Sequence, residues 1–444
     1  MRQAVQHPAR IVPLAFLAAV ALGTALMMLP AARAEPGYAP FVTALFTATS
    51  AVCVTGLTVV DTPGYWSGFG HVLITVLTHI GGFGIMTMAT LLGLLVSRRL
   101  GLRGRLMAQA ESGGLVTGDV RGVLVRVALT MLVCEAVITV FVGGRFWLGY
   151  GYPPGRALWE GFFHAAQAFN NGGFALYPDS LVRFVDDWWI CVPLMLGVVA
   201  GAIGFPVLFE LAREWRKPGC WSTHTRLTVW GFGLLTVVGF VAILAFEWRN
   251  PRTLGPLGLS GKLLAALVQD TMTRSGGFNS VDIGAMTTET IAVGNTLMFI
   301  GGGSASTAGG IRVTTFFLLA YVIWAELRGE PDVVVGRRRI AEETQRQAVT
   351  VALLGVALVA SGTLILIGLT DGIPFDRALF EVTSAFATVG LSTGITATLP
   401  PAAQVVLVIL MYVGRVGTIA VGTAIALNTQ RRLYRYPEER PLVG

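Results

Sequence analysis

Four short stretches decide the fold: residues 46–58 read FTATSAVCVTGLT, 163–175 read FHAAQAFNNGGFA, 267–279 read LVQDTMTRSGGFN and 380–392 read FEVTSAFATVGLS. In each stretch a bulky apolar residue stands ten positions before a glycine, which Leu or Phe follows. The four glycines are Gly56, Gly173, Gly277 and Gly390. Self-similarity at this spacing predicts that the chain consists of four copies of one unit.

The composition around these stretches is that of a membrane protein. Hydrophobic residues make up 54% of the 444 residues and charged residues only 13%, against about 25% charged in soluble domains. This composition excludes a soluble globular protein and a disordered one. The net charge of +7 lies mostly in gaps between apolar runs, so its expected partner is the lipid headgroup and not nucleic acid. The four cysteines are far apart and predict neither a disulfide framework nor a zinc site.

Each short stretch lies between two apolar runs that are long enough to cross a bilayer. Eight such runs are predicted near 11–30, 70–96, 123–143, 188–211, 227–247, 290–325, 348–370 and 402–427. The stretches between the members of each pair, near 41–53, 158–170, 262–274 and 375–387, are too short to cross.

The first run could instead be a signal peptide, because Arg2 and Arg10 precede it and residues 32–34 resemble a cleavage site. Its apolar core is longer than a signal core, and its loss would break the pairing of spans. We therefore expect four repeats, at 1–97, 98–212, 213–326 and 327–444, the third with an intramembrane loop at 301–314 and the fourth with a cytoplasmic tail. Alternate gaps carry 21 and eight Lys and Arg residues, which predicts cytoplasmic N- and C-termini.

A half-length helix that turns back at mid-depth leaves carbonyl groups that lipid cannot satisfy, so they must line something polar. Glycine at the turn permits positive φ and close packing. Four such turns around one pseudo-fourfold axis would form a ring of carbonyl oxygens able to replace the water shell of K⁺. The predicted filter residues are Val54, Thr55, Gly56, Asn171, Gly172, Gly173, Ser275, Gly276, Gly277, Thr388, Val389 and Gly390.

One glycine motif alone is more often a plain loop between helices, but four in register favour the filter. Asp61, Asp179 and Asp282 follow the turns, where they could concentrate cations at the mouth. A solvated loop face explains these acids nearly as well.

A break is predicted 24 residues after the third filter glycine. Residues 301–310 hold five Gly and three Ser or Thr, which cannot form a continuous helix cheaply. Broken backbone at that depth must face protein or water, so we expect it beneath the filter; a small-residue packing face is the alternative. The predicted gate residues are Gly301, Gly302, Gly303, Ser304, Ser306, Thr307, Gly309, Gly310 and Arg415.

Three arginines lie at membrane depth, where an unpaired cation is costly. Arg415 is expected to face the pore and pair with the broken segment. Arg274 could pair with Asp270 or Glu381, and Arg312 is expected to reach the inner surface.

These residues resemble the Trk/Ktr/HKT superfamily of potassium transporters. The strings that carry the resemblance are SAVCVTGLTVVDT (50–62), AFNNGGF (168–174), TRSGGFNS (273–280), SAFATVGLSTG (384–394), FIGGGSASTAGGI (299–311) and GRVGT (414–418). The resemblance implies an all-α membrane protein of four consecutive M1–pore helix–M2 units, K⁺ channel-like, and is strongest to KtrB-type membrane subunits of the bacterial Ktr system.

The resemblance also implies a function and partners. It implies K⁺ uptake across the bacterial inner membrane by a homodimer seated on a cytosolic, KtrA-like ring of RCK subunits. That ring, and not this chain, would bind ATP or ADP, and Na⁺ could act as an activator. Glycine at all four filter positions favours K⁺, and the loop with Arg415 corresponds to the family's gate.

Two other classes of function compete with a conducting pathway. A membrane enzyme is disfavoured, because the sequence holds no HExxH motif, nucleophile elbow or acid pair within a span. The nearer alternative is a Na⁺-coupled or Na⁺-conducting secondary transporter. Such folds often contain inverted repeats, whereas these four copies are parallel.

Overall fold

The computed structural model describes residues 8–99, 120–336 and 338–417, and these residues form an almost wholly helical protein. The end of the predicted span 402–427, the tail after it and most of the basic gap at 97–126 lie outside the described residues. So does the start of the chain, residues 1–7.

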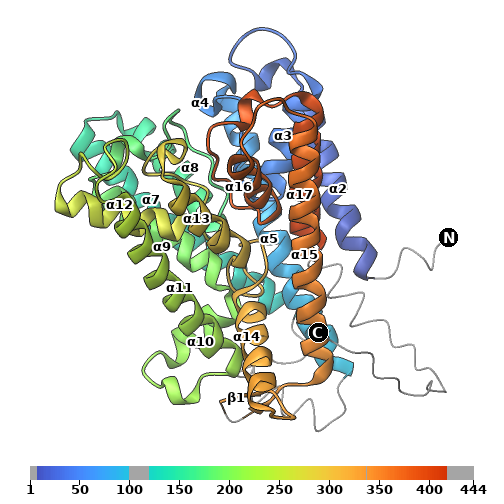
Figure 1. Cartoon of the computed structure of the whole chain (residues 1–444). Helices are drawn as coiled ribbons and strands as arrows, with labels where there is room; N and C mark the ends of the chain where they lie inside the picture. Colours follow the sequence, from blue (N-terminus) through green and yellow to red (C-terminus); the bar gives the residue numbers. More distant parts are fainter. Residues whose placement is uncertain (1–7, 100–119, 337, 418–444) are drawn as a thin grey trace, which may run out of the picture.

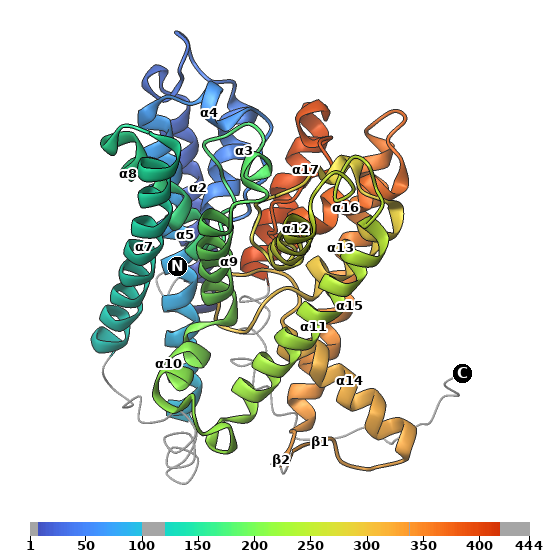
Figure 2. The ribbon, with the colours of Figure 1, turned by 90° about the vertical axis from the view of Figure 1, so that its left-hand side faces the viewer.

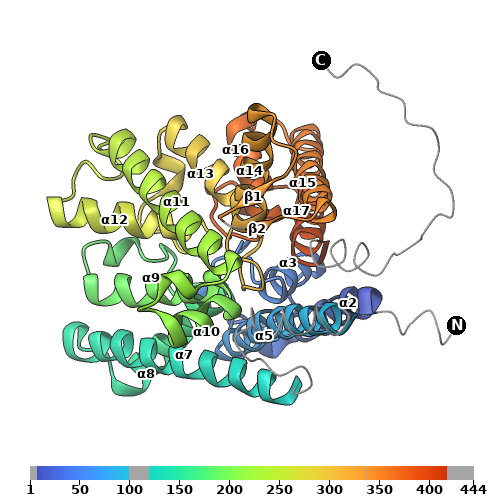
Figure 3. The ribbon, with the colours of Figure 1, turned by 90° about the horizontal axis from the view of Figure 1, so that it is seen from below.

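The helices repeat one order four times: a first helix, a short helix, a turn and a second helix (Figure 1). They are α2 (Pro8–Met27), α3 (Phe41–Val52) and α5 (Gly68–Arg99); α7 (Val120–Tyr150), α8 (Pro154–Asn170) and α9 (Trp188–Ile203); α11 (Thr223–Glu247), α12 (Leu259–Met272) and α13 (Thr288–Ile300); α15 (Glu342–Gly368), α16 (Phe375–Phe386) and α17 (Pro401–Tyr412). Seen from below, the four groups lie in chain order around one centre (Figure 3). The fold is therefore the predicted fourfold arrangement.

Proline marks the start of three short helices. Pro40 and Pro374 precede α3 and α16, and Pro154 is the first residue of α8. Proline suits these positions because its fixed φ fits the helix start and its missing N–H has no partner there anyway. Every residue from Phe46 to the end of α3 is buried, so the short helices point their last turns into the protein interior.

The outer faces of the long helices are apolar. On α7, for example, Leu129, Leu132 and Val140 are more than half exposed. Within the residues that the structure describes, three helices are long and apolar enough to cross a membrane by themselves, at Leu124–Tyr150, Thr223–Glu247 and Glu342–Gly368. Large exposed apolar belts are costly in water, so this is an all-α membrane protein.

The second helices of three repeats are interrupted. The predicted span at 188–211 is bent: α9 and α10 (Phe205–Glu214) pass together as one apolar stretch, but the chain turns by 106° between them at Gly204. Gly204 has φ +96°, a conformation that favours glycine. The predicted break in the third repeat is confirmed: residues 301–312, the intramembrane loop, separate α13 from α14 (Val313–Arg328). In the fourth repeat α17 continues as a π-helix, η6 (Val413–Gly417).

Short elements connect the long helices at both ends of the molecule. The connecting turns are α4 (Thr62–Tyr65) and the 3₁₀ helices η1 (Pro30–Ala32), η2 (Val182–Phe184), η3 (Pro218–Cys220), η4 (Ile283–Ala285) and η5 (Thr396–Thr398). A two-stranded hairpin pairs β1 (Val334–Val335) with β2 (Arg338–Arg339). The hairpin and α10 lie at the end of the molecule opposite to α4 (Figure 2).

Candidate functional site

The turns that follow the short helices meet backbone to backbone at the centre of the molecule. A β-carbon added to Gly56 would lie 2.4 Å from the carbonyl oxygen of Gly172. One added to Gly173 would lie 2.6 Å from the Cα of Gly277. No larger residue fits at these distances, so glycine permits the first three turns to touch.

The same contacts close the ring through the fourth turn. A β-carbon on Gly277 would lie 2.9 Å from the carbonyl oxygen of Val389. One on Gly390 would lie 2.0 Å from the carbonyl oxygen of Thr55, back in the first turn. The four turns thus form a closed ring in chain order.

All four turns share an unusual backbone. The four glycines of the ring have φ between +70° and +92°. The residues two positions earlier, which are not glycines, also have positive φ: Val54, Asn171, Ser275 and Thr388. Left-handed conformations are rare for such residues, above all for β-branched Val and Thr, and strained backbone of this kind gathers at functional sites.

The amide groups of the turns point back to the short helices. Three N–H groups donate to carbonyls five residues earlier: Thr55 to Ser50 at 2.7 Å, Gly172 to Gln167 at 2.7 Å and Val389 to Ser384 at 2.9 Å. In the third turn Gly276 donates to Met272 at 2.9 Å. Because these N–H groups bond to the short helices on one side of each turn, the carbonyl groups of the turn are left to face the other side.

The glycine carbonyls and those just before them are free of internal donors. Within the described residues, no hydrogen bond reaches the carbonyl oxygens of Thr55, Gly56, Gly172, Gly173, Gly276, Gly277, Val389 or Gly390. Buried carbonyls normally have a partner, so these oxygens are the candidate ligands for a dehydrated cation.

Two serines that the sequence argument overlooked support the first and fourth turns. The Ser50 hydroxyl accepts from the N–H of Gly56 at 3.0 Å and donates to the Leu57 carbonyl at 2.8 Å. Ser384 accepts in the same way from Gly390 at 3.1 Å. Both serines stand six residues before their glycine, a shared spacing that could have revealed them.

The intramembrane loop lies against three of the four turns. The Thr307 hydroxyl donates to Asn171 Oδ1 at 2.9 Å, and the N–H of Gly309 donates to Ser275 Oγ at 3.0 Å. A β-carbon on Gly309 would lie 2.2 Å from the carbonyl oxygen of Ala387, next to the fourth turn. The segment predicted to lie beneath the filter is therefore in contact with these turns.

The loop donates hydrogen bonds to backbone carbonyls at the bend at Gly204. Because α9 ends there, the carbonyls of its last turn lack helical partners. Gly303 donates to the Ala202 carbonyl at 2.8 Å, and Thr307 to the Gly201 carbonyl at 3.2 Å. The second repeat thus provides the seat on which the loop of the third repeat rests.

Two arginines hold the loop by its carbonyls. Arg415 is 1% exposed and its guanidinium donates to the Thr307 carbonyl, so it pairs with the loop as predicted. Arg312 does not reach the inner surface, which corrects the prediction. Its side chain folds back and donates to the Ala308 carbonyl, to Ser306 Oγ at 3.2 Å and to the Gly303 carbonyl at 3.3 Å.

The third membrane-depth arginine, Arg274, pairs with Asp270. The guanidinium lies 3.0 Å from the Asp270 carboxylate, one helical turn away, and also donates to the Phe232 carbonyl at 2.7 Å. Both members of the pair are fully buried. The other candidate, Glu381, instead accepts hydrogen bonds from Ser392, Thr393 and Thr396.

The acids near the outer mouth have local structural partners. Asp61 caps α4 by accepting from Gly64 at 3.2 Å, and Asp282 caps η4 by accepting from Gly284 at 2.9 Å. Asp179 lies 2.7 Å from Arg183, and this hydrogen bond raises the pKa of the Arg183 guanidinium. These contacts favour the solvated loop face over a carboxylate-lined mouth.

The comparisons with known proteins agree with this geometry. The TrkH family, described as cation transport protein, matches residues 3–435. The chain is 35% identical to Ktr system potassium uptake protein B of Bacillus subtilis (strain 168), over 98% of this chain and 97% of that protein. It is also 35% identical to the protein of the same name from Vibrio alginolyticus, over 98% and 94% of the two chains.

A solved structure has the same fold. The crystal structure of the potassium transporter TrkH from Vibrio parahaemolyticus matches with a TM-score of 0.70, over 95% of this chain and 84% of that one, at 21% identity. The family match spans nearly the whole length, including the four turns, the loop and Arg415. The chain therefore belongs to the TrkH family of cation transport proteins, within the Trk/Ktr superfamily that its motifs resemble.

Proposed function

We propose that this protein takes up potassium ions across a bacterial inner membrane through a single-chain selectivity filter. K⁺ would pass along its electrochemical gradient between the carbonyl oxygens of the four turns. The observation that carries the proposal is the closed ring, in which Gly56, Gly173, Gly277 and Gly390 bring four turns into contact. The relatives named as potassium uptake proteins support K⁺ as the ion.

The proposed gate is the segment 301–314, which comprises the loop and the first two residues of α14, together with Arg415. A guanidinium below the filter repels a permeant cation, and the loop contacts three of the four turns. Opening would require the loop to leave these contacts. We attribute that step to a cytosolic, KtrA-like RCK ring that binds ATP or ADP, with this chain acting as a homodimer.

The proposal includes the topology that follows from the charge distribution. Both termini would be cytoplasmic, and the repeats would run from 1–97, 98–212, 213–326 and 327–444. The end that carries the β1–β2 hairpin and α10 (Figure 2) would then face the cytosolic ring.

Complementation tests the function directly. Potassium-deficient cells that express this chain with an RCK partner should regain growth on low K⁺ and take up K⁺ in flux assays, with and without Na⁺. Failure to rescue with the partner present would contradict the proposal. Uptake that requires Na⁺ stoichiometrically, or that prefers Na⁺ to K⁺, would favour the Na⁺-coupled or Na⁺-conducting alternative.

A serine at the first filter glycine tests the site. Its β-carbon would meet the Gly172 carbonyl at 2.4 Å, so Gly56→Ser should widen or distort the ring and admit Na⁺. Gly144→Ser is the matched control, because that position has open space around it. Unchanged selectivity in a folded Gly56→Ser protein would remove Gly56 from the filter.

A further inference from the structure

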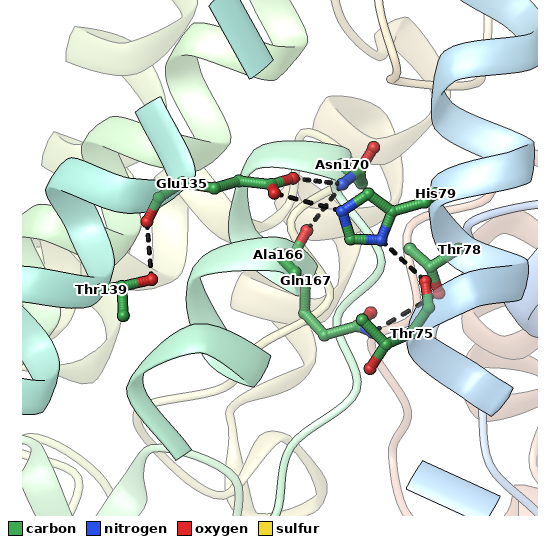
Figure 4. A network of polar contacts seen from close by, with 8 residues as sticks. All are labelled: Thr75, Thr78, His79, Glu135, Thr139, Ala166, Gln167 and Asn170. Carbon is green, nitrogen blue, oxygen red and sulfur yellow. Dashed lines mark hydrogen bonds and ion pairs between the residues drawn. The ribbon is translucent and has the colours of Figure 1, made fainter. Parts of the chain in front are cut away.

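A buried carboxylate lies beside the second filter turn. Glu135 on α7 is 1% exposed and lies within the membrane-crossing stretch Leu124–Tyr150. Figure 4 shows it between α5 and α8, with its two oxygens aimed at different partners. Ionisable groups at this depth are costly and usually functional.

One oxygen of Glu135 holds the last residue of the second short helix. Asn170 Nδ2 donates to Glu135 Oε1 at 2.9 Å and to the Ala166 carbonyl at 3.0 Å. Asn170 directly precedes Asn171, the left-handed residue that opens the second turn. The position of Asn170 therefore sets where the turn begins.

The other oxygen of Glu135 is held by His79 on α5. His79 Nε2 lies 3.1 Å from Glu135 Oε2, and Nδ1 lies 2.8 Å from the Thr75 carbonyl. A carbonyl can only accept, so Nδ1 carries a proton, and the contact to Glu135 needs one more. Whether that proton is on nitrogen or oxygen, the pair has zero net charge, which makes it tolerable inside the membrane.

The helix α5 packs tightly on the same residue. A β-carbon on Gly82 would lie 2.1 Å from Asn170 Oδ1. Thr78 accepts from Gln167 Nε2 at 3.4 Å, one turn before Asn170. Helix α5 of the first repeat and helix α7 of the second thus both contact the end of α8.

We propose that Glu135 is a positioning residue for the second filter turn, acting through Asn170 and held in place by His79. The inference rests on the proposed function, because it takes the turn to be part of a K⁺ filter. The link continues on the other side of the turn, where Asn171 Oδ1 accepts from Thr307 of the loop at 2.9 Å. The carboxylate therefore lies at one end of a chain of contacts that passes through the filter to the gate.

The chemistry of the pair makes Glu135→Gln a conservative change. Its amide oxygen can accept from Asn170, and its NH₂ group can donate to Nε2 of a neutral His79 that keeps its bond to Thr75. Glu135→Leu removes both contacts. If the role is to position Asn170, glutamine should preserve it and leucine should not.

The test uses the purified full chain in liposomes together with an RCK partner and ATP, so that the proposed gate is open, with K⁺ and Na⁺ fluxes measured side by side. Glu135→Leu and Asn170→Leu should each lower the ratio of K⁺ to Na⁺ flux by about threefold or more. Glu135→Gln should stay within about twofold of the unmodified protein. Thr139→Val is the matched control one turn along α7, since it removes only a bond to the Glu135 carbonyl, and its ratio should not change.

Thermal unfolding, and elution from a size-exclusion column as a single species, show whether each variant is folded. If Glu135→Leu does not fold, Asn170→Leu tests the same inference. A folded Glu135→Leu or Asn170→Leu protein with an unchanged flux ratio would overturn the inference. So would a Glu135→Gln protein as unselective as the leucine variant. If the unmodified chain conducts no K⁺ with the partner and ATP present, the proposed function itself fails, which is a different outcome from either of these.

Discussion

Arg312 and Arg415 reach the same short segment of the loop from different repeats. Arg415 donates to the Thr307 carbonyl, and Arg312 to the Ala308 carbonyl. Neither arginine forms an ion pair with an acid among the described residues. Hydrogen bonds from charged groups to loop carbonyls are thus the contacts that hold the closed loop at this point.

Removing either guanidinium should loosen the gate. Arg415→Ala and Arg312→Gln each lose hydrogen bonds from a charged donor, worth about 1.5–3 kcal/mol. Flux without the cytosolic partner should therefore rise roughly tenfold or more. Arg328→Gln is a suitable control, because Arg328 is exposed and its ion pair with Glu330 is long, at 3.9 Å. If both variants, without the partner, carry no more flux than the unmodified protein, the proposed gate is refuted.

At the scale of helices, the ends of the short helices pack closely against glycines of the second helices. A β-carbon on Gly81 would lie 2.0 Å from the Val52 carbonyl, and one on Gly201 would lie 2.0 Å from that of Phe169. The fourth repeat has the same contact, with 1.8 Å between a β-carbon on Gly414 and the Phe386 carbonyl. Each carbonyl stands four residues before a ring glycine, so these contacts set the height of the turns.

Gly414→Ala should therefore displace the π-helix that carries Arg415. The added methyl group cannot fit against the Phe386 backbone, and overpacking of this kind costs about 1–3 kcal/mol. We expect a lower midpoint of thermal unfolding and a higher flux without the partner. Gly144→Ala, with nothing within 4 Å, should leave both unchanged. Equal behaviour of the two variants would contradict the proposed seat.

At the scale of the whole molecule, helix α17 of the fourth repeat contacts α2 of the first. The Tyr412 hydroxyl donates to the Pro13 carbonyl at 2.6 Å, which joins the fourth repeat to the first. At the centre, the four turns are joined by close packing and by the Ser275 hydroxyl, which lies 2.7 Å from the Thr388 carbonyl oxygen and 3.4 Å from that of Ala387. An ion bound to all four turns would tie the repeats together.

Potassium should therefore stabilise the whole fold. A ligand at about 100 times its Kd adds about 2.7 kcal/mol to the free energy of unfolding. The thermal midpoint of the purified protein should be higher in K⁺ than in an organic cation of equal ionic strength, and Gly56→Ser should lose most of this difference. A midpoint that is independent of K⁺ in the unmodified protein would argue against a site shared by the four turns.

The sequence by itself determined the fourfold repeat, the membrane class, the glycine turns and the break after Ile300. Each is written in local spacing: hydrophobic length, a glycine after a half-length helix, or a run too rich in glycine for a helix. The pairing of Arg415 with the loop also followed, because a buried charge needs a partner.

Only the tertiary structure decided the partners that come from other repeats. The bend at Gly204 packs against the loop of the third repeat, where a β-carbon on Gly204 would meet the Ser304 carbonyl at 2.5 Å. Glu135 contacts Asn170 and His79, which lie 35 and 56 positions away in the sequence, only once three helices are packed. These contacts join residues dozens of positions apart, and no local spacing encodes a distance that the packing of four repeats creates.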